Sequence, residues 1–298
     1  MAHTSPQKSA LIIIAFGLVS ISFASIFIKM SDAPSLVIAA YRLVLASLFY
    51  VAFTRIKAGP IGAGISRSSF RMMFISAIFL TIHFSAWITS LKYTSVASSV
   101  VLVQSAPIFV ALGSLVFLRE RPSLLMISGI AIALIGAIGI SIHDFAMNQG
   151  TLFGNVLALG GALGAAGYLL AGRKIRAVVD TFPYVTIVYS LTAVFLLLLT
   201  LASGAALTGY SGRNYLLFFA IAFFPQVIGH TSFNWALKYF SATAVSILLL
   251  GEPIGASILA VIFLGESLSL MKVIGGLVIL TGVSIAIIAE GRVHKQQV

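Results

Sequence analysis

Residues 91–121 read LKYTSVASSVVLVQSAPIFVALGSLVFLRER, and residues 237–267 read LKYFSATAVSILLLGEPIGASILAVIFLGES. The two stretches align without a gap at an offset of 146 positions, which is 237 minus 91. The same residue occurs 146 positions later at Leu91, Lys92, Tyr93, Ser95, Leu102, Pro107, Ile108, Phe117, Leu118 and Glu120. The same register continues past the stretches, where Gly129 and Gly136 also align with glycines. The chain therefore contains an internal duplication.

The composition places this duplicated chain in a membrane. Of its 298 residues, 60% are hydrophobic and 8% are charged, which is more apolar surface than a soluble core needs. Runs of about 20 apolar residues, the length of a membrane-crossing helix, recur along the chain. They predict an all-α integral membrane protein with ten transmembrane helices, because the strands of a barrel would alternate polar and apolar residues. The predicted helices span 9–28, 34–54, 70–91, 94–117, 123–142, 151–171, 182–202, 215–237, 241–264 and 271–289.

The positive charges predict how these helices are oriented. Cytoplasmic loops of membrane proteins are rich in Lys and Arg, and most cations here fall at the termini and after the second, fourth, sixth and eighth predicted helices. Both termini are therefore expected in the cytoplasm. The net charge of +11 follows from this topology, so no nucleic-acid partner is needed to explain it. The first helix is expected to be retained, because no small-x-small cleavage site clearly ends it.

Each copy of the repeat holds five predicted helices, an odd number, so the second copy must cross the membrane inverted. We expect the first copy in residues 1–142, the second in 151–289, and a cytoplasmic tail in 290–298. Inverted repeats around a midplane site are typical of secondary transporters, in which one half rocks against the other. Channels and some membrane enzymes are also duplicated, so the repeat favours a transporter without excluding them.

Two prolines, Pro107 and Pro253, lie near the middle of the repeated helices. Each lacks an N–H group, so a carbonyl in the preceding turn loses its donor, which suits a hinge or a binding site. Gln104 lies just before the first proline, and Glu252 directly before the second. Glu252 is the one acidic residue predicted deep in a helix, so it either exchanges a proton or belongs to a structural pair.

Arg42 is the corresponding deep cation, about 12 Å inside its predicted helix. An arginine at this depth costs at least about 2.5 kcal/mol in lipid, so it should face the protein interior. It either contacts a substrate or is satisfied by carbonyls at helix ends.

Polar and aromatic residues spaced four apart mark two further helices. They are Phe79, His83 and Trp87 in one helix, and Gln226, His230 and Asn234 in the other. Residues four apart share one helix face, and polar faces within a membrane need a polar environment such as an internal cavity. The alternative is that both histidines are core residues bonded to neighbouring helices.

The other helices carry weaker indications. The helix predicted at 151–171 contains Tyr168, which is its large amphipathic side chain, and a GxxxG formed by Gly160 and Gly164. Such glycines favour close helix packing, within one chain or between two. The helix predicted at 182–202 is almost continuously apolar and is expected to face lipid.

Several function classes lack their motifs. The chain has no cysteine, no H-E-x-x-H sequence and one deep carboxylate, so it lacks the constellation of an intramembrane hydrolase or a metal site. It also lacks a GxxxxGK[ST] loop, so direct ATP-driven cycling is not expected. No catalytic residue, metal ligand or cofactor is predicted.

The two inverted halves, the segment AAYRLVLASL around Arg42, and the doubled motifs PIFVALGSLVFLRE and GEPIGASILAVIFLGE resemble the EamA-type branch of the drug/metabolite transporter superfamily. The resemblance covers essentially the whole chain. It implies a multi-pass exporter of small metabolites in the bacterial inner membrane, with alternating access to a central cavity. Within the branch, the chain looks most like amino-acid exporters of the YddG kind.

These observations predict an exporter of small amphipathic metabolites, with aromatic or neutral amino acids as the first candidates and protons as a candidate coupling ion. The functional unit is expected to be a monomer in the bilayer. The alternatives are another metabolite or drug-like substrate, and a facilitator or channel in place of a coupled carrier. The predicted cavity residues are Arg42, His83, Trp87, Gln104, Tyr168, Gln226, His230, Asn234 and Glu252, with Pro107 and Pro253 as hinges.

Overall fold

A computed structural model describes residues 6–59, 61–62, 64–93, 99, 102–145, 152–264 and 270–296. Within these ranges the chain forms helices joined by short segments, and no strand is present. Helices satisfy their own backbone hydrogen bonds, which suits apolar runs in lipid. In chain order the elements are α1 (Pro6–Lys29), α2 (Ser35–Ala58), α3 (Arg67–Tyr93), α5 (Ala106–Gly113), η1 (Ser114–Leu118), α6 (Leu124–Phe145), α7 (Leu152–Arg176), α8 (Thr181–Ala202), α9 (Gly212–Ile221), η2 (Ala222–His230), α10 (Thr231–Ala236), α11 (Ala242–Leu248), η3 (Leu249–Gly251), α12 (Glu252–Leu264) and α13 (Leu270–Gln296).

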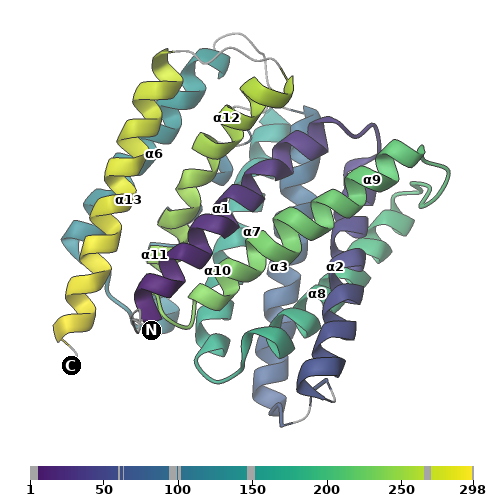
Figure 1. The fold of residues 1–298 in the computed structure, drawn as a ribbon, viewed down its shortest axis with the longest axis horizontal. Coiled ribbons are helices and arrows are strands. Elements are labelled where there is room, and N and C mark those ends of the chain that lie inside the picture. Colours follow the sequence, from purple (N-terminus) through teal and green to yellow (C-terminus); the bar gives the residue numbers. More distant parts are fainter. Residues whose placement is uncertain are drawn as a thin grey trace, which may run out of the picture.

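Within the described ranges, seven helical segments are long and apolar enough to cross a membrane. They are Ile12–Lys29, Ser35–Lys57, Arg67–Tyr93, Leu152–Arg176, Thr181–Ala202, Gly212–Ala236 and Ala242–Phe263. Shorter apolar helices lie at Ala106–Leu118, Leu124–Gly136 and Val273–Ala286. The prediction of an all-helical membrane protein is confirmed, whereas the count of ten crossings and the cytoplasmic position of the termini stay predictions. Figure 1 shows the first residues of α1 and the end of α13 at the same end of the molecule.

Some predicted boundaries differ from the structure. α13 continues to Gln296, so most of the predicted tail at 290–298 is helical. Residues 94–98, 100 and 101 of the predicted fourth helix, and Glu266 of the second motif, lie outside the described residues.

Helices α6 and α13 form an antiparallel pair at one side of the molecule (Figure 1). A Cβ atom added at Gly136 would lie 2.6 Å from the carbonyl oxygen of Gly275, and one added at Gly129 would lie 2.9 Å from that of Gly282. The helix backbones therefore touch through small residues. Gly129 aligns with Gly275 in the repeat, and Gly136 aligns with Gly282. Each copy thus contacts the other through the same two positions, as in an interface with two-fold symmetry.

The other helices place α1 beside the α9–η2–α10 segment and α12, with α2, α3, α7 and α8 packed behind them (Figure 1). α8 packs against both α2 and α3. Tyr184 and Tyr189 of α8 have no exposed surface. The prediction that this helix faces lipid is therefore wrong for one of its faces, because a continuous apolar run hides which residues meet neighbouring helices.

In both repeated stretches the regular α-helical pattern changes just before the proline, within the described residues. In the first copy, Gln104 and Ser105 form a turn and α5 begins at Ala106. In the second copy, the 3₁₀ turn η3 leads into α12 at Glu252. Pro107 and Pro253 therefore lie in the first turn of a helix, where a missing N–H breaks no helical hydrogen bond. Their role as hinges stays a prediction.

Candidate functional site

A cavity of about 70 Å³ lies between the two copies of the repeat. Its wall is lined by Ile21, Ala24, Arg42, His83, Trp87, Val103, Gln104, Ala106, Ala165, Tyr168, Leu169, His230, Phe233, Ser246, Leu249 and Glu252. Most of the residues predicted from the sequence therefore meet at one place: Arg42, His83, Trp87, Gln104, Tyr168, His230 and Glu252. Gln226 and Asn234 are not part of the lining.

Arg42 reaches this cavity from the middle of α2 with no exposed surface. Its Nε donates a hydrogen bond to Oε1 of Gln226 at 2.7 Å, and its guanidinium carbon lies 4.2 Å from the ring centre of Phe84. Nη1 and Nη2 have no hydrogen-bond partner. Gln226, one of the predicted cavity residues, therefore positions the arginine from behind the wall.

Glu252 lines the same cavity from the start of α12. Its backbone carbonyl accepts a hydrogen bond of 3.4 Å from Oγ of Ser22 in α1. Among the contacts of the described residues, its carboxylate has no hydrogen bond and forms no ion pair with Arg42. The cavity thus contains one fixed cation and one carboxyl group that do not neutralise each other by direct contact.

The two histidines that the sequence predicted in the cavity wall, His83 and His230, lie in one aromatic cluster at the cavity. The ring centres of His83 and His230 are 6.3 Å apart, and His83 stacks on Trp87 with ring centres 5.8 Å apart. His83 Nδ1 is 2.9 Å from the carbonyl oxygen of Gly161. Nε1 of Trp87 is buried and lacks a partner. His83 therefore fits both interpretations of the sequence, since it bonds a neighbouring helix and also lines the cavity.

The α3 stripe packs against the glycines of α7. A Cβ atom added at Gly164 would lie 2.6 Å from the backbone nitrogen of His83, and one added at Gly161 would lie 3.0 Å from Cβ of Trp87. Phe79 meets the same helix one turn earlier and does not line the cavity. The regular spacing in α3 thus reflects helix packing first, and two of its three residues also reach the cavity.

Asn234 belongs to a network of hydroxyl groups behind the cavity wall. Its Nδ2 donates hydrogen bonds to Oη of Tyr168 and, at 3.1 Å, to Oη of Tyr189. Tyr189 is also 3.3 Å from the hydroxyl of Thr231, and Tyr184 is 2.8 Å from that of Ser76. Sequence reasoning missed both α8 tyrosines, because residues five apart do not share a helix face. Their amphipathic rings were the available indication, since buried tyrosine hydroxyls usually find a partner.

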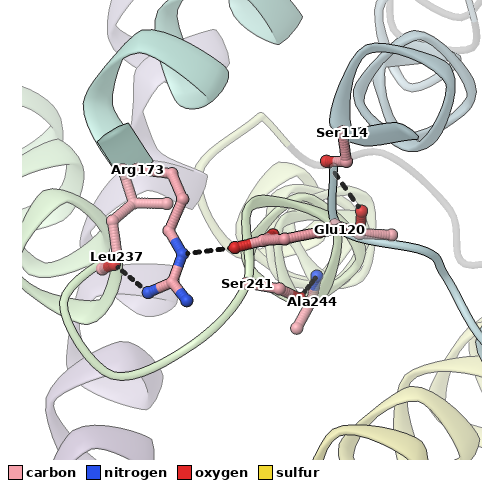
Figure 2. Close-up of polar contacts among 7 residues, drawn as sticks. Ser114, Glu120, Arg173, Leu237, Ser241 and Ala244 are labelled. Carbon is pink, nitrogen blue, oxygen red and sulfur yellow. Dashed lines mark hydrogen bonds and ion pairs between the residues drawn. The ribbon is translucent and has the colours of Figure 1, made fainter. Parts of the chain in front are cut away.

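Glu120, the glutamate of the first repeated motif, connects the two copies of the repeat through Arg173 (Figure 2). Arg119 adopts a left-handed conformation with φ of 58°, and the backbone nitrogen of Glu120 donates to the carbonyl of Ser114 at 3.1 Å. The Glu120 carboxylate accepts a hydrogen bond of 3.1 Å from Nε of Arg173 at the end of α7. Nη1 of Arg173 in turn donates to the carbonyl of Leu237 at 2.8 Å. Arg173 therefore links the first copy to the segment between α10 and α11.

The described part of the chain contains no group of three His, Asp or Glu residues arranged to hold a metal ion.

Comparison with known proteins agrees with this arrangement of two similar halves. The sequence pattern of the EamA-like transporter family matches the chain twice, over residues 8–142 and 152–288. The chain belongs to the EamA-like transporter family. This EamA-like protein is thus a multi-pass membrane transporter, and the prediction that it is not an enzyme is confirmed.

Two similar proteins are also described as transporters. An uncharacterized transporter of Archaeoglobus fulgidus is 25% identical over 267 residues, which are 88% of this chain and 91% of the relative. The uncharacterized transporter YxxF of Bacillus subtilis is 23% identical over 289 residues, covering 96% and 92% of the two chains. One crystal structure superimposes with a TM-score of 0.79 at 16% identity over 95% of this chain and 98% of the other, which shows a common fold.

Proposed function

We propose that this EamA-like transporter exports small amphipathic metabolites, and amino acids with aromatic or other neutral side chains in particular, across the bacterial inner membrane. The observation that carries this proposal is the buried Arg42 guanidinium, whose Nη1 and Nη2 lack partners, in the wall of a largely apolar cavity. A small solute with a carboxylate and an apolar part complements such a wall. Amino-acid exporters of the YddG kind are the corresponding subgroup within the branch.

The transport cycle in this proposal is alternating access around the cavity, with a monomer of ten membrane helices in two inverted halves. Residues of both matched parts line the cavity, which supports movement of one half against the other. The proposed topology places both termini in the cytoplasm, residue 66 on the cytoplasmic side and residue 203 outside.

The topology can be tested by cysteine labelling, because the chain has no cysteine. Ser66→Cys and Ser203→Cys would each introduce one thiol in an exposed position. In intact cells, an impermeant maleimide should label the variant at 203 and leave the one at 66 unlabelled until the cells are lysed. The reverse pattern would contradict the proposed orientation.

The cavity chemistry favours amino acids over phosphorylated sugars. A sugar-phosphate site is expected to present several Lys or Arg side chains, whereas Arg42 is the one such residue in the described lining. Glu252 would further disfavour a ligand that has net negative charge. Equal uptake of sugar phosphates and amino acids would contradict this substrate class.

The direct test is uptake of radiolabelled phenylalanine, threonine and methionine into liposomes that contain the purified protein, with and without a pH gradient. Saturable uptake is expected, because a carrier binds its substrate in each cycle, and uptake that does not saturate would indicate a channel. An effect of the gradient that disappears in Glu252→Gln would support proton coupling through this residue. Saturable uptake that ignores both the gradient and the substitution would identify a facilitator with a structural glutamate. No uptake of any amino acid would contradict the proposed substrate class.

A further inference from the structure

We infer that the cavity binds a dipolar α-amino acid in one orientation, with its carboxylate on Nη1 and Nη2 of Arg42 and its ammonium group on Glu252. This inference rests on the proposed function and makes it specific. It starts from two observations about the same cavity: Arg42 has two nitrogen atoms without a partner, and the Glu252 carboxylate has no bond within the described residues.

The arginine is held in place for a bidentate ligand. Gln226 fixes one edge of the guanidinium through Nε, and Phe84 packs against its face, 4.2 Å from the guanidinium carbon. These contacts leave the edge that bears Nη1 and Nη2 unbonded. Two parallel N–H donors match the two oxygens of a carboxylate, which a lysine cannot reproduce. Buried N–H groups without an acceptor are also costly, so a carboxylate bound to Nη1 and Nη2 would stabilise this arrangement.

The carboxyl group of Glu252 is positioned by the break in the repeated helix. The 3₁₀ turn η3 ends directly before this residue, and Ser22 of α1 bonds its backbone carbonyl at 3.4 Å. The side chain therefore starts from an anchored turn, while its oxygens are left for a ligand. An ammonium group supplies N–H donors and a positive charge, and both are what an ionised carboxylate needs.

Electroneutrality determines which ligands fit. An α-amino acid adds no net charge and gives each buried group an opposite partner. A carboxylic acid without the amine would satisfy Arg42 but add a second negative charge near Glu252. An amine without the carboxylate would leave Nη1 and Nη2 of Arg42 without an acceptor. The rest of the wall includes Trp87, Leu169 and Phe233, which suit an apolar side chain on the bound amino acid.

The test is ligand binding, which is separate from transport. Affinities of phenylalanine, 3-phenylpropionate and phenethylamine for the purified protein are measured by calorimetry in detergent. The three probes share an aromatic ring and differ in their charged groups. Because each charged hydrogen-bonded contact contributes on the order of 10- to 100-fold, phenylalanine should bind wild type more tightly than either analogue by about that factor. Equal affinities of wild type for the three probes would overturn the inference without any mutation.

Two variants assign the charged ends of the ligand. Glu252→Gln should weaken phenylalanine by about 10- to 100-fold and leave phenylpropionate as tight as before or tighter. Arg42→Lys should weaken phenylalanine and phenylpropionate while sparing phenethylamine. Asp180→Asn serves as the matched control, because this carboxylate is 80% exposed, pairs with Lys238 and is not part of the cavity lining. It should keep all three affinities.

The outcomes separate this inference from the proposed function. If amino acids are transported and Glu252→Gln weakens phenylalanine and phenylpropionate equally, the two-ended site is wrong while amino-acid transport stands. If phenylalanine neither binds nor is transported, the proposed substrate class fails, and the inference fails with it.

Discussion

Gly164 in α7 offers a direct test of how the wall of the cavity is assembled. A Cβ atom at this position would lie 2.6 Å from the backbone nitrogen of His83 and 2.8 Å from the carbonyl oxygen of Phe79. Real Cβ atoms do not approach backbone atoms this closely. In Gly164→Ala the α3 and α7 backbones must therefore separate by about 0.8 Å to bring the shorter distance to the 3.4 Å of an ordinary contact.

The cost of this separation can be isolated with a second glycine on the same helix. At Gly160 an added Cβ would have Ala86 Cβ as its nearest neighbour, at 3.9 Å, which is an ordinary contact. Both Gly→Ala changes gain about 1 kcal/mol of helix propensity, so their difference leaves the steric effect. Overpacking of this kind costs about 1–3 kcal/mol. Gly164→Ala should be less stable than Gly160→Ala by about that amount.

The assay is thermal unfolding of the two purified variants and wild type in the same detergent. Gly160→Ala should unfold at the wild-type temperature or above it, and Gly164→Ala below it. Because His83 moves with α3, Gly164→Ala should also bind phenylalanine more weakly. Equal unfolding temperatures for the two variants would refute the close contact between α3 and α7.

Three further predictions concern contacts away from the cavity. Glu120→Gln should lower stability by less than about 1 kcal/mol, because the pair with Arg173 is partly exposed, and unfolding in high salt should reduce the difference from wild type. Thr186→Val should cost about 1–3 kcal/mol of stability, since it removes a buried contact of 2.7 Å to the hydroxyl of Thr54. In unfolding measurements, the variant with valine at both positions should lose less stability than the two single variants together, because the two hydroxyls bond each other. Asn214→Ala should speed hydrogen exchange in the segment between α1 and α2, because the Asn214 side chain accepts two hydrogen bonds from it, at 2.7 and 3.2 Å; unchanged exchange would contradict this role.

The features that the sequence predicted are those that depend on composition and on the position of a residue within an apolar run. Long apolar runs predicted membrane helices, because lipid leaves the backbone little choice. Depth within these runs also identified Arg42 and Glu252 without knowledge of any contact, since a charge at mid-membrane must face the protein interior. The structure places both residues in the lining of one cavity.

The features that the sequence did not predict depend on which helices are neighbours. Gln226 and Asn234 were expected in the cavity wall, yet one bonds Arg42 and the other bonds Tyr168 and Tyr189 from behind. A polar residue on a buried helix face has the same pattern whether it meets a ligand or another side chain. The role of Arg173 was hidden for the same reason, because its partners lie 53 and 64 residues away along the chain.

The repeat also explains why the two sides of the cavity differ in charge. Val103 aligns with Leu249 and Ala106 aligns with Glu252 at the offset of 146 positions, and all four residues line the cavity. The cavity therefore lies where equivalent positions of the two copies face each other. A symmetric pair of side chains there would offer a dipolar ligand two equivalent orientations. The first copy instead has Ala106 where the second has Glu252, so the negative group of the wall comes from the second copy. The positive group, Arg42, comes from the first copy. A ligand held between these two groups would contact both halves at once, which in the proposed alternating-access cycle would couple its binding to the movement of one half against the other.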